Sequence, residues 1–211
     1  MTEKPNSWSG GGSPDKRRAI IEGALAIFSR DGYTRAGLDA IAAEAGVSSR
    51  TIYNHFKDKA SLFEAVIEES SRRLVETQLA IIDRHLHKIV ELEGDLVAFG
   101  IEWISVRNSA NAPHFALVRQ IHAEAEHIPA AAIAAWQENG PQRVRRELAD
   151  RLCAIAERHP LKMDDPERAA GHLMVLISSD NLPYLVGPPA EREVAAMVAA
   201  GVHTFLHGYQ A

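Results

Sequence analysis

The chain is 211 residues long, and 46 % of its residues are hydrophobic while only 6 % are aromatic. This content predicts a folded chain with a hydrophobic core, and the lack of an apolar run of about 20 residues argues against a membrane-spanning helix. The formal net charge of −5 argues against a protein that is basic throughout, and the single cysteine, Cys153, excludes an internal disulfide and favours a reducing, cytoplasmic setting.

The first 14 residues are expected to form a flexible tail, because they are rich in glycine and serine and show no apolar period. Residues 1–13 also lack the apolar region of a secretory signal. Positive charge gathers near this end: residues 1–60 carry nine lysines and arginines against seven acidic residues, whereas the remainder is acidic. Such an asymmetry suits a protein that touches a polyanion with one end, although it is a weak signal on its own.

Helical periodicity follows the tail, with almost none of the alternation typical of strands. A first helix carries an apolar stripe from Ile20 to Phe28 and ends at Asp31-Gly32, where glycine suits a left-handed cap. Short helices are expected at Leu38–Ala45 and Ser49–Phe56. Longer helices, separated by prolines such as Pro141, are expected over residues 62–90, 95–108, 114–127, 129–139, 141–158, 166–180 and 190–207.

A helix-turn-helix is predicted around Gly46. This motif needs a small residue where its two helices cross, a residue that tolerates positive φ in the turn, and an apolar residue that fixes the second helix to the core. Ala42, Gly46 and Ile52 meet these needs in turn. We therefore predict an all-α chain with a three-helix DNA-binding domain over residues 15–60 and a larger helical domain over residues 61–211.

The second helix of this motif is expected to bury Ile52 and Phe56 and to turn its other side chains outward, none of them acidic. Arg50 suits a guanine edge and Asn54 an adenine edge, while Lys59 begins the next helix, whose N–H groups attract phosphate. For any single residue, a polar face that is simply solvated remains the alternative. The predicted DNA contacts are Arg35, Ser48, Ser49, Arg50, Thr51, Tyr53, Asn54, His55 and Lys59.

The segment from Arg17 to about Glu69 resembles the DNA-binding domain of the TetR family of bacterial repressors. The matching residues are Ala26-Ile27-Phe28, Gly32-Tyr33, Ile41-Ala42, Ala45-Gly46-Val47-Ser48, Thr51-Ile52-Tyr53-Asn54-His55-Phe56, and Lys59 with Leu62. The resemblance implies contacts to DNA backbone or bases at Thr51, Tyr53, His55 and Lys59. It also implies that the DNA sequence is recognised by residues that vary between family members, which here are Ser49, Arg50 and Asn54.

The start of the predicted second helix departs from this family. Members usually place Thr or Ser there, where the hydroxyl caps the helix and touches phosphate, but this chain has Ala36-Gly37. Gly37 can still cap the helix, although the side-chain contact is lost. We expect Thr34 or Arg35 to replace that contact.

Residues 70–211 carry no Gly-x-Ser-x-Gly motif, phosphate-cradling glycine loop or His-Glu-x-x-His motif, so we expect no enzyme, cofactor or bound metal. His203 and His207 have a usable metal-ligand spacing, but no carboxylate or cysteine completes a site by spacing. The alternative is a helical enzyme or carrier that uses the helix-turn-helix as scaffold, and it would need convergent titratable groups in this part.

The segment from His114 to Ile177 resembles the AefR-type C-terminal domain of one TetR subgroup, through Leu117–Glu126, Gly140-Pro141 and Asp164–Ala170. The TetR resemblance implies a small apolar or amphipathic effector held inside this domain. Large side chains at helical spacing are otherwise core residues. Those that would line an effector pocket are Phe99, Trp103, Phe115, Trp136, Met174 and Tyr184.

Two apolar segments near the end of the chain, Leu173–Ile177 and the stripe from Val194 to Phe205, need either the chain's own core or a second copy. The family resemblance implies a four-helix bundle made from the last two helices of each protomer. A two-fold dimer suits a pseudo-palindromic operator with half-sites about one helical turn apart. Our main hypothesis is a homodimeric repressor released from DNA by its effector. An activator is the alternative, because sequence does not set the sign of regulation.

Overall fold

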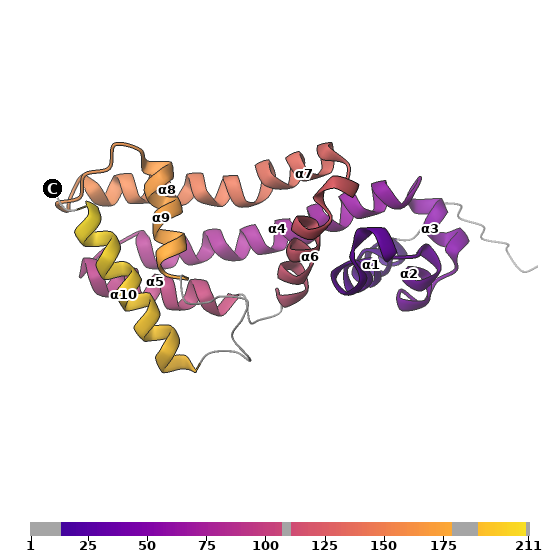
Figure 1. Cartoon of the computed structure of the whole chain (residues 1–211), viewed down its shortest axis with the longest axis horizontal. Helices are drawn as coiled ribbons and strands as arrows, with labels where there is room; N and C mark the ends of the chain where they lie inside the picture. Colours follow the sequence, from indigo (N-terminus) through magenta and orange to yellow (C-terminus); the bar gives the residue numbers. More distant parts are fainter. Residues whose placement is uncertain (1–13, 107–110, 179–189, 210–211) are drawn as a thin grey trace, which may run out of the picture. The chain divides into compact units, whose positions relative to one another are not determined.

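The computed structural model describes residues 14–106, 111–178 and 190–209, which form helices and turns without an extended strand (Figure 1). The prediction of an all-α fold is confirmed, and the predicted tail lies outside the described residues apart from Pro14. The helices are α1 (Pro14–Arg35), α2 (Leu38–Glu44), α3 (Ser49–His55), α4 (Lys59–Leu86), α5 (Leu92–Ser105), α6 (Ala112–Ala123), α7 (Ala130–Gln137), α8 (Arg143–Ala156), α9 (Pro166–Leu176) and α10 (Glu191–Tyr209). None of these helices, within the described ranges, is long and apolar enough to cross a membrane.

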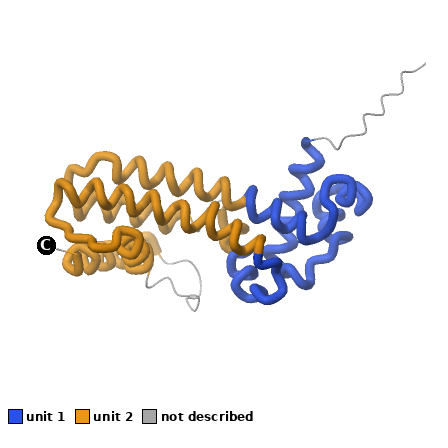
Figure 2. The backbone as a smooth tube through the Cα atoms, turned by 90° about the horizontal axis from the view of Figure 1, so that it is seen from above, with its two compact units in different colours: residues 1–69, 116–130 blue, residues 70–115, 131–211 orange. Residues whose placement is uncertain are grey.

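The chain divides into two compact units (Figure 2). Unit 1 contains residues 1–69 and 116–130, and unit 2 contains residues 70–115 and 131–211. Unit 1 therefore combines the predicted DNA-binding segment with the first turns of α4, most of α6 and the 3₁₀ turn η2 (Ala125–His127).

An aromatic cluster holds the helices of unit 1 together. Phe28 of α1 is fully buried and meets Phe63 of α4 edge-on, with ring centroids 4.9 Å apart, and Tyr33 lies 4.8 Å from Phe63. Helix α1 also approaches the end of α2 closely, because a Cβ on Gly23 would lie 2.9 Å from the backbone nitrogen of Ala45. The close packing of α2 against α1 therefore requires a residue without a side chain at position 23, which is Gly23.

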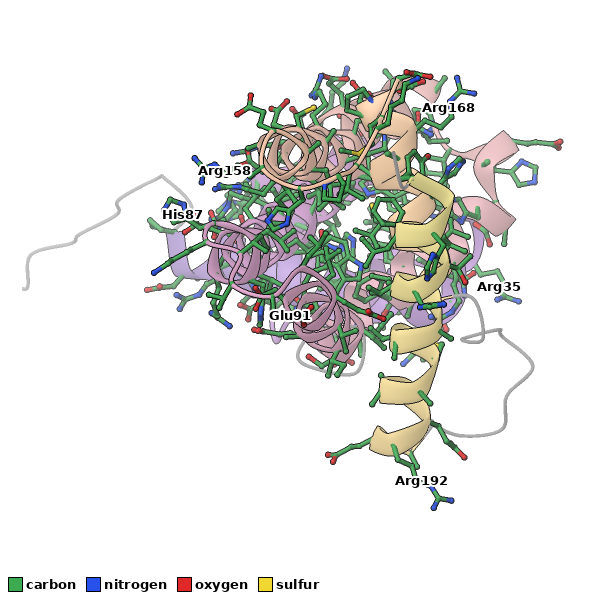
Figure 3. All side chains as sticks on the ribbon, turned by 90° about the vertical axis from the view of Figure 1, so that its left-hand side faces the viewer. Arg35, His87, Glu91, Arg158, Arg168 and Arg192 are labelled. Atoms are coloured by element: carbon green, nitrogen blue, oxygen red, sulfur yellow. The ribbon has the colours of Figure 1, made fainter. Side chains whose placement is uncertain are left out.

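Helix α10 packs across α5 and α9 in unit 2. Figure 3 looks along the long helices of this unit and shows α10 crossing them, with Arg192 near its first turn. Val198 and Phe205 of α10 are buried with Phe99 in one hydrophobic cluster. The predicted apolar stripe of the last helix thus packs into the core of its own chain.

A π-helical turn, η3 (Glu138–Gln142), joins α7 to α8 and contains Pro141. The residues on both sides, Gln137 and Arg143, have right-handed helical backbone angles, so the helical path continues through the proline. Two helices therefore meet at Pro141, as predicted, but the π-helical turn joins them without a break in the helical path. A proline lacks the N–H that an α-helix needs at this point, and the wider turn accommodates it.

Candidate nucleic-acid interface

Gly46 makes the turn between α2 and α3. Its φ of 65° lies in the left-handed region, and an added Cβ would meet nothing within 4 Å, so the backbone conformation alone favours glycine. The N–H of Val47 donates to the Ala42 carbonyl at 2.9 Å. Ser48 then caps α3, because its hydroxyl accepts from the N–H of Thr51 at 3.2 Å. The predicted turn and the predicted cap are both confirmed.

Helix α3 has a buried face and an exposed face. Ile52 is 1 % exposed and Phe56 is 6 % exposed, as predicted, whereas Tyr53 is 59 % exposed. Arg50 and Asn54 are exposed as well. The structure therefore gathers a guanidinium, a phenol and a carboxamide on one surface of this short helix, and all three can hydrogen-bond to base edges or phosphates.

Several other predicted contact residues make hydrogen bonds that hold α3 in place. The hydroxyl of Ser49 donates to the Asp39 carboxylate at 2.6 Å, which joins α3 to α2. The hydroxyls of Ser48 and Thr51 lie 2.9 Å apart. The Nε2 of His55 is buried and has no hydrogen-bond partner within the described part of the chain.

The connection from α1 to α2 lacks a capping side chain, as expected. Ala36 is 2 % exposed, and Gly37 stands at the N-cap of α2 without a side-chain hydrogen bond. Arg35 is exposed (Figure 3), and its Nε donates to the Asp31 carbonyl at 2.9 Å. The hydroxyl of Thr34 donates to the Glu124 carboxylate at 3.0 Å. Of the two residues expected to replace the missing hydroxyl, Thr34 therefore already has an acceptor inside the chain.

Lys59 begins α4 next to this connection. Its Nζ donates to the Thr34 carbonyl at 3.1 Å and lies 4.9 Å from the centre of the Tyr33 ring. Burial lowers the pKa of the Lys59 ammonium, and the nearby Glu124 carboxylate opposes this effect. Lys59 is the first residue of α4, and the N–H groups at the start of a helix also attract anions. The ammonium and these N–H groups can therefore attract the same DNA phosphate.

Glu124 is a neighbour of this surface that the sequence does not predict. Thr34 and Glu124 are 90 residues apart in the chain. Neither helical period nor motif spacing links residues at such a distance, so no signal in a single sequence could have paired them.

Four of the candidate effector residues lie in or against the hydrophobic core of unit 2. Phe99 and Trp103 are buried with ring centroids 5.3 Å apart, and Phe115 and Met174 are half-buried against the same hydrophobic cluster. Trp136 is buried outside that cluster. Tyr184 lies outside the described residues. A cleft of about 730 Å³ between α8 and α9 has none of these side chains, and its lining is charged, with Arg145, Arg146, Asp165, Glu167 and Arg168 among its residues.

Two family models match the chain. The model described as bacterial regulatory proteins of the tetR family matches residues 20–66, and the C-terminal domain of the AefR-like transcriptional repressor matches residues 103–211. The HTH-type transcriptional regulator AcrR of Shigella flexneri is 40 % identical over 65 residues, which are 31 % of this chain and 30 % of that protein. The chain spans about a third of the length of the curated relatives it matches.

Solved structures extend the likeness over nearly the whole chain. A TetR-family transcriptional regulator from Mesorhizobium loti has a TM-score of 0.79 and 27 % identity, and the match covers 93 % of this chain and 97 % of that chain. The flavonoid-responsive regulator FrrA has a TM-score of 0.70 and 26 % identity over 92 % of this chain and 97 % of that chain. The family and the fold are those of transcriptional regulators.

Proposed function

Because this chain belongs to the TetR family of bacterial regulatory proteins, we propose that it is a ligand-responsive, DNA-binding repressor that acts in the cytoplasm as a homodimer. The exposed face of α3 carries the proposal. Ile52 of this helix and Phe56 directly after it are buried in the core of unit 1, and the helix presents Arg50, Tyr53 and Asn54 outward. The proposal assigns no enzymatic reaction to the chain.

Within this proposal, two residues of α3 read base edges: Arg50 pairs with guanine and Asn54 with adenine. Tyr53, Arg35 and Lys59 bind the phosphate backbone on either side, which fixes the register of the protein on the duplex. Four further residues are proposed to border the same interface: Ser48, Ser49 and Thr51, whose hydroxyls hold α3 in place, and His55.

A mobility-shift titration tests the DNA-binding proposal, with the purified protein and the promoter region beside its own gene. We expect specific binding whose affinity falls steeply as salt rises, because lysines and arginines displace counterions from the phosphates. Binding that is absent, or that does not respond to salt, would contradict the proposal. A promoter–reporter fusion tests the sign of regulation, since a repressor lowers expression and an activator raises it.

Two substitutions separate base reading from phosphate binding. Arg50→Ala is expected to reduce the preference for operator over unrelated DNA by roughly tenfold, because a bidentate pair with guanine is lost. Lys59→Ala is expected to weaken binding to both DNAs to a similar extent and to reduce the salt dependence. Arg158→Ala, which removes an exposed cation of unit 2, serves as the control and should bind like wild type. Equal losses of preference in Arg50→Ala and Lys59→Ala would refute these assignments.

We propose that the second copy binds along α9 and α10. Val175 of α9 is 66 % exposed, which is unusual for a valine in the middle of a helix. It borders a cleft of about 630 Å³ whose lining is mostly apolar: His172, Val175, Leu176, Thr204, Phe205, Gly208 and Tyr209. The apolar stripe of α10 that is buried in the core of unit 2 packs against the inner side of this surface.

Val175→Lys is expected to turn the dimer into a monomer, because an unpaired charge buried between two copies costs several kcal/mol. Sedimentation velocity measures the change. Val90→Lys is the matched control, since Val90 is 82 % exposed in unit 2 but does not lie on α9 or α10. A monomeric wild type, or a Val175→Lys variant that stays dimeric, would rule out this interface.

The effector is proposed to be a small apolar or amphipathic molecule that contacts the large side chains of unit 2: Phe99, Trp103, Phe115, Trp136 and Met174. The structural likeness to a flavonoid-responsive regulator supports a flavonoid as the first probe. Such a probe must bind the DNA-free form more tightly than the DNA-bound form to shift the equilibrium. Operator DNA that stays bound at a saturating probe concentration would exclude the flavonoid class.

A further inference from the structure

The carboxylate of Glu124 occupies a cluster of donors at the end of α1. It accepts from the N–H of Thr34 at 2.7 Å and from the Thr34 hydroxyl at 3.0 Å. Burial opposes the ionisation of Glu124, but these two donors and the N–H of Tyr33 together hold its pKa below its usual value. The carboxylate is therefore charged near neutral pH and is held by several hydrogen bonds at once.

Gly32 makes room for this contact. Its φ of 80° is a conformation that side chains other than glycine rarely adopt, and an added Cβ would overlap the Glu124 carboxylate. The same Cβ would lie 3.1 Å from the Oε1 of Gln120 on α6. The backbone at the end of α1 is thus shaped to receive side chains from the end of α6, and residues 116–130 belong to unit 1 (Figure 2).

Thr34 links Glu124 to the cation at the start of α4. On one side its N–H and hydroxyl donate to Glu124, and on the other its carbonyl accepts from the Nζ of Lys59 at 3.1 Å. The position of the Lys59 ammonium therefore depends on where the Thr34 peptide is held.

We propose that Glu124 is a positioning residue for operator binding: it fixes Thr34, and through the Thr34 carbonyl it fixes the Lys59 ammonium where a DNA phosphate is met. This inference rests on the proposed DNA-binding function. It assigns to the segment after α6 a direct part in building the DNA-contacting surface of unit 1. The opposite effect, repulsion of DNA by the carboxylate, would instead make Glu124→Ala bind operator more tightly than wild type.

A double-mutant cycle on the full-length protein tests the proposal, with operator affinity as the readout. Glu124→Ala is expected to weaken operator binding roughly fivefold and Lys59→Ala roughly tenfold. The double variant should match Lys59→Ala within about twofold, because Glu124 acts through Lys59. Fold-losses that multiply, or a Glu124→Ala variant that binds as well as or better than wild type, would overturn the proposal.

Two further variants show whether a loss of affinity reflects local positioning. Glu124→Gln keeps one acceptor oxygen for the Thr34 N–H and should retain part of the affinity that Glu124→Ala loses. Glu126→Ala removes an exposed carboxylate two residues later and should bind like wild type. Equal losses in Glu124→Ala and Glu126→Ala would indicate a general disturbance of this segment and not the loss of one positioning contact, which contradicts the proposal.

Hydrogen exchange at the Thr34 amide measures the contact without DNA. Exchange is expected to be at least roughly tenfold faster in Glu124→Ala than in wild type, while thermal melting shows that unit 1 remains folded. If the amide exchanges faster but wild type binds no operator, the proposed function fails and the positioning role fails with it. If wild type binds operator and the Thr34 amide exchanges at the same rate in both proteins, only the role of Glu124 is refuted.

Discussion

Gly201→Ala is expected to lower the free energy of unfolding by about 3 kcal/mol, the upper end of the usual cost of overpacking a core. The reason lies where α10 crosses α9. An added Cβ at Gly201 would overlap the backbone carbonyl of Leu176 and lie 2.9 Å from the backbone nitrogen of Ile177. Backbone atoms cannot rotate away as a side chain can, so α10 itself would have to move. Urea unfolding followed by circular dichroism measures the loss.

Gly171→Ala is the matched control for this prediction. Gly171 lies within α9, where an added Cβ would meet nothing within 4 Å. Alanine is a better helix former than glycine by up to about 1 kcal/mol, so this variant should be as stable as wild type or slightly more stable. A Gly201→Ala variant that unfolds at the same urea concentration as Gly171→Ala would show that the α9–α10 crossing is not tightly packed.

Acidification from pH 7 to pH 4 is expected to remove roughly 3 kcal/mol of stability through His114 alone. Burial lowers the pKa of His114 from its ordinary 6.5 to about 4, and its Nδ1 lies 3.1 Å from the hydroxyl of Ser70 inside unit 2. Below pH 6.5 the unfolded chain takes up a proton at this ring that the folded chain does not. The stabilising effect is therefore complete above pH 6.5 and is lost as the pH falls towards 4.

Carboxylates also contribute to the loss of stability in acid, because the pKa values of groups such as Glu102 and Asp165 are lowered in the folded state. Comparison of wild type with His114→Asn separates the effect of the His114 ring from theirs. An asparagine amide can still form a hydrogen bond with the Ser70 hydroxyl, but it does not take up a proton in this pH range. Unfolding curves at several pH values give the free energy of unfolding of both proteins. The gap between the two free energies should narrow as the pH falls from 6.5 to 4. A constant gap would mean that His114 does not titrate in this way.

The local features of the DNA-binding surface were predictable from the sequence. The 3.6-residue period places Ile52 and Phe56 on one face of a helix, and positive φ in a tight turn calls for a residue such as Gly46. Ser48 is a strong N-cap residue followed by a short helical segment. Each of these signals acts within one or two helical turns, and a single sequence carries such signals directly.

The features that depend on distant pairs were not predictable in the same way. Gly23 and Gly201 look like ordinary helical glycines until the backbone that crosses each of them is known. Glu124 is one of two acidic residues directly after α6, and only the fold brings it to Thr34. The stripe of α10 could be recognised as buried, but its period does not say whether the covering surface belongs to the same chain or to a second copy.

The π-helical turn between α7 and α8 bears on which changes of length this part of the chain can tolerate. Its buried residues recur every fourth position: Ala132, Trp136, Gly140, Val144, Leu148 and Leu152. In an α-helix of 3.6 residues per turn such a row would drift by about 200°, and the turn takes up one extra residue, which removes about half of that drift. Deletion of Pro141 itself should therefore restore plain α-helix and leave both buried faces in phase. Deletion of one residue within α8 would instead rotate all that follows by about 100° and turn its apolar row towards solvent.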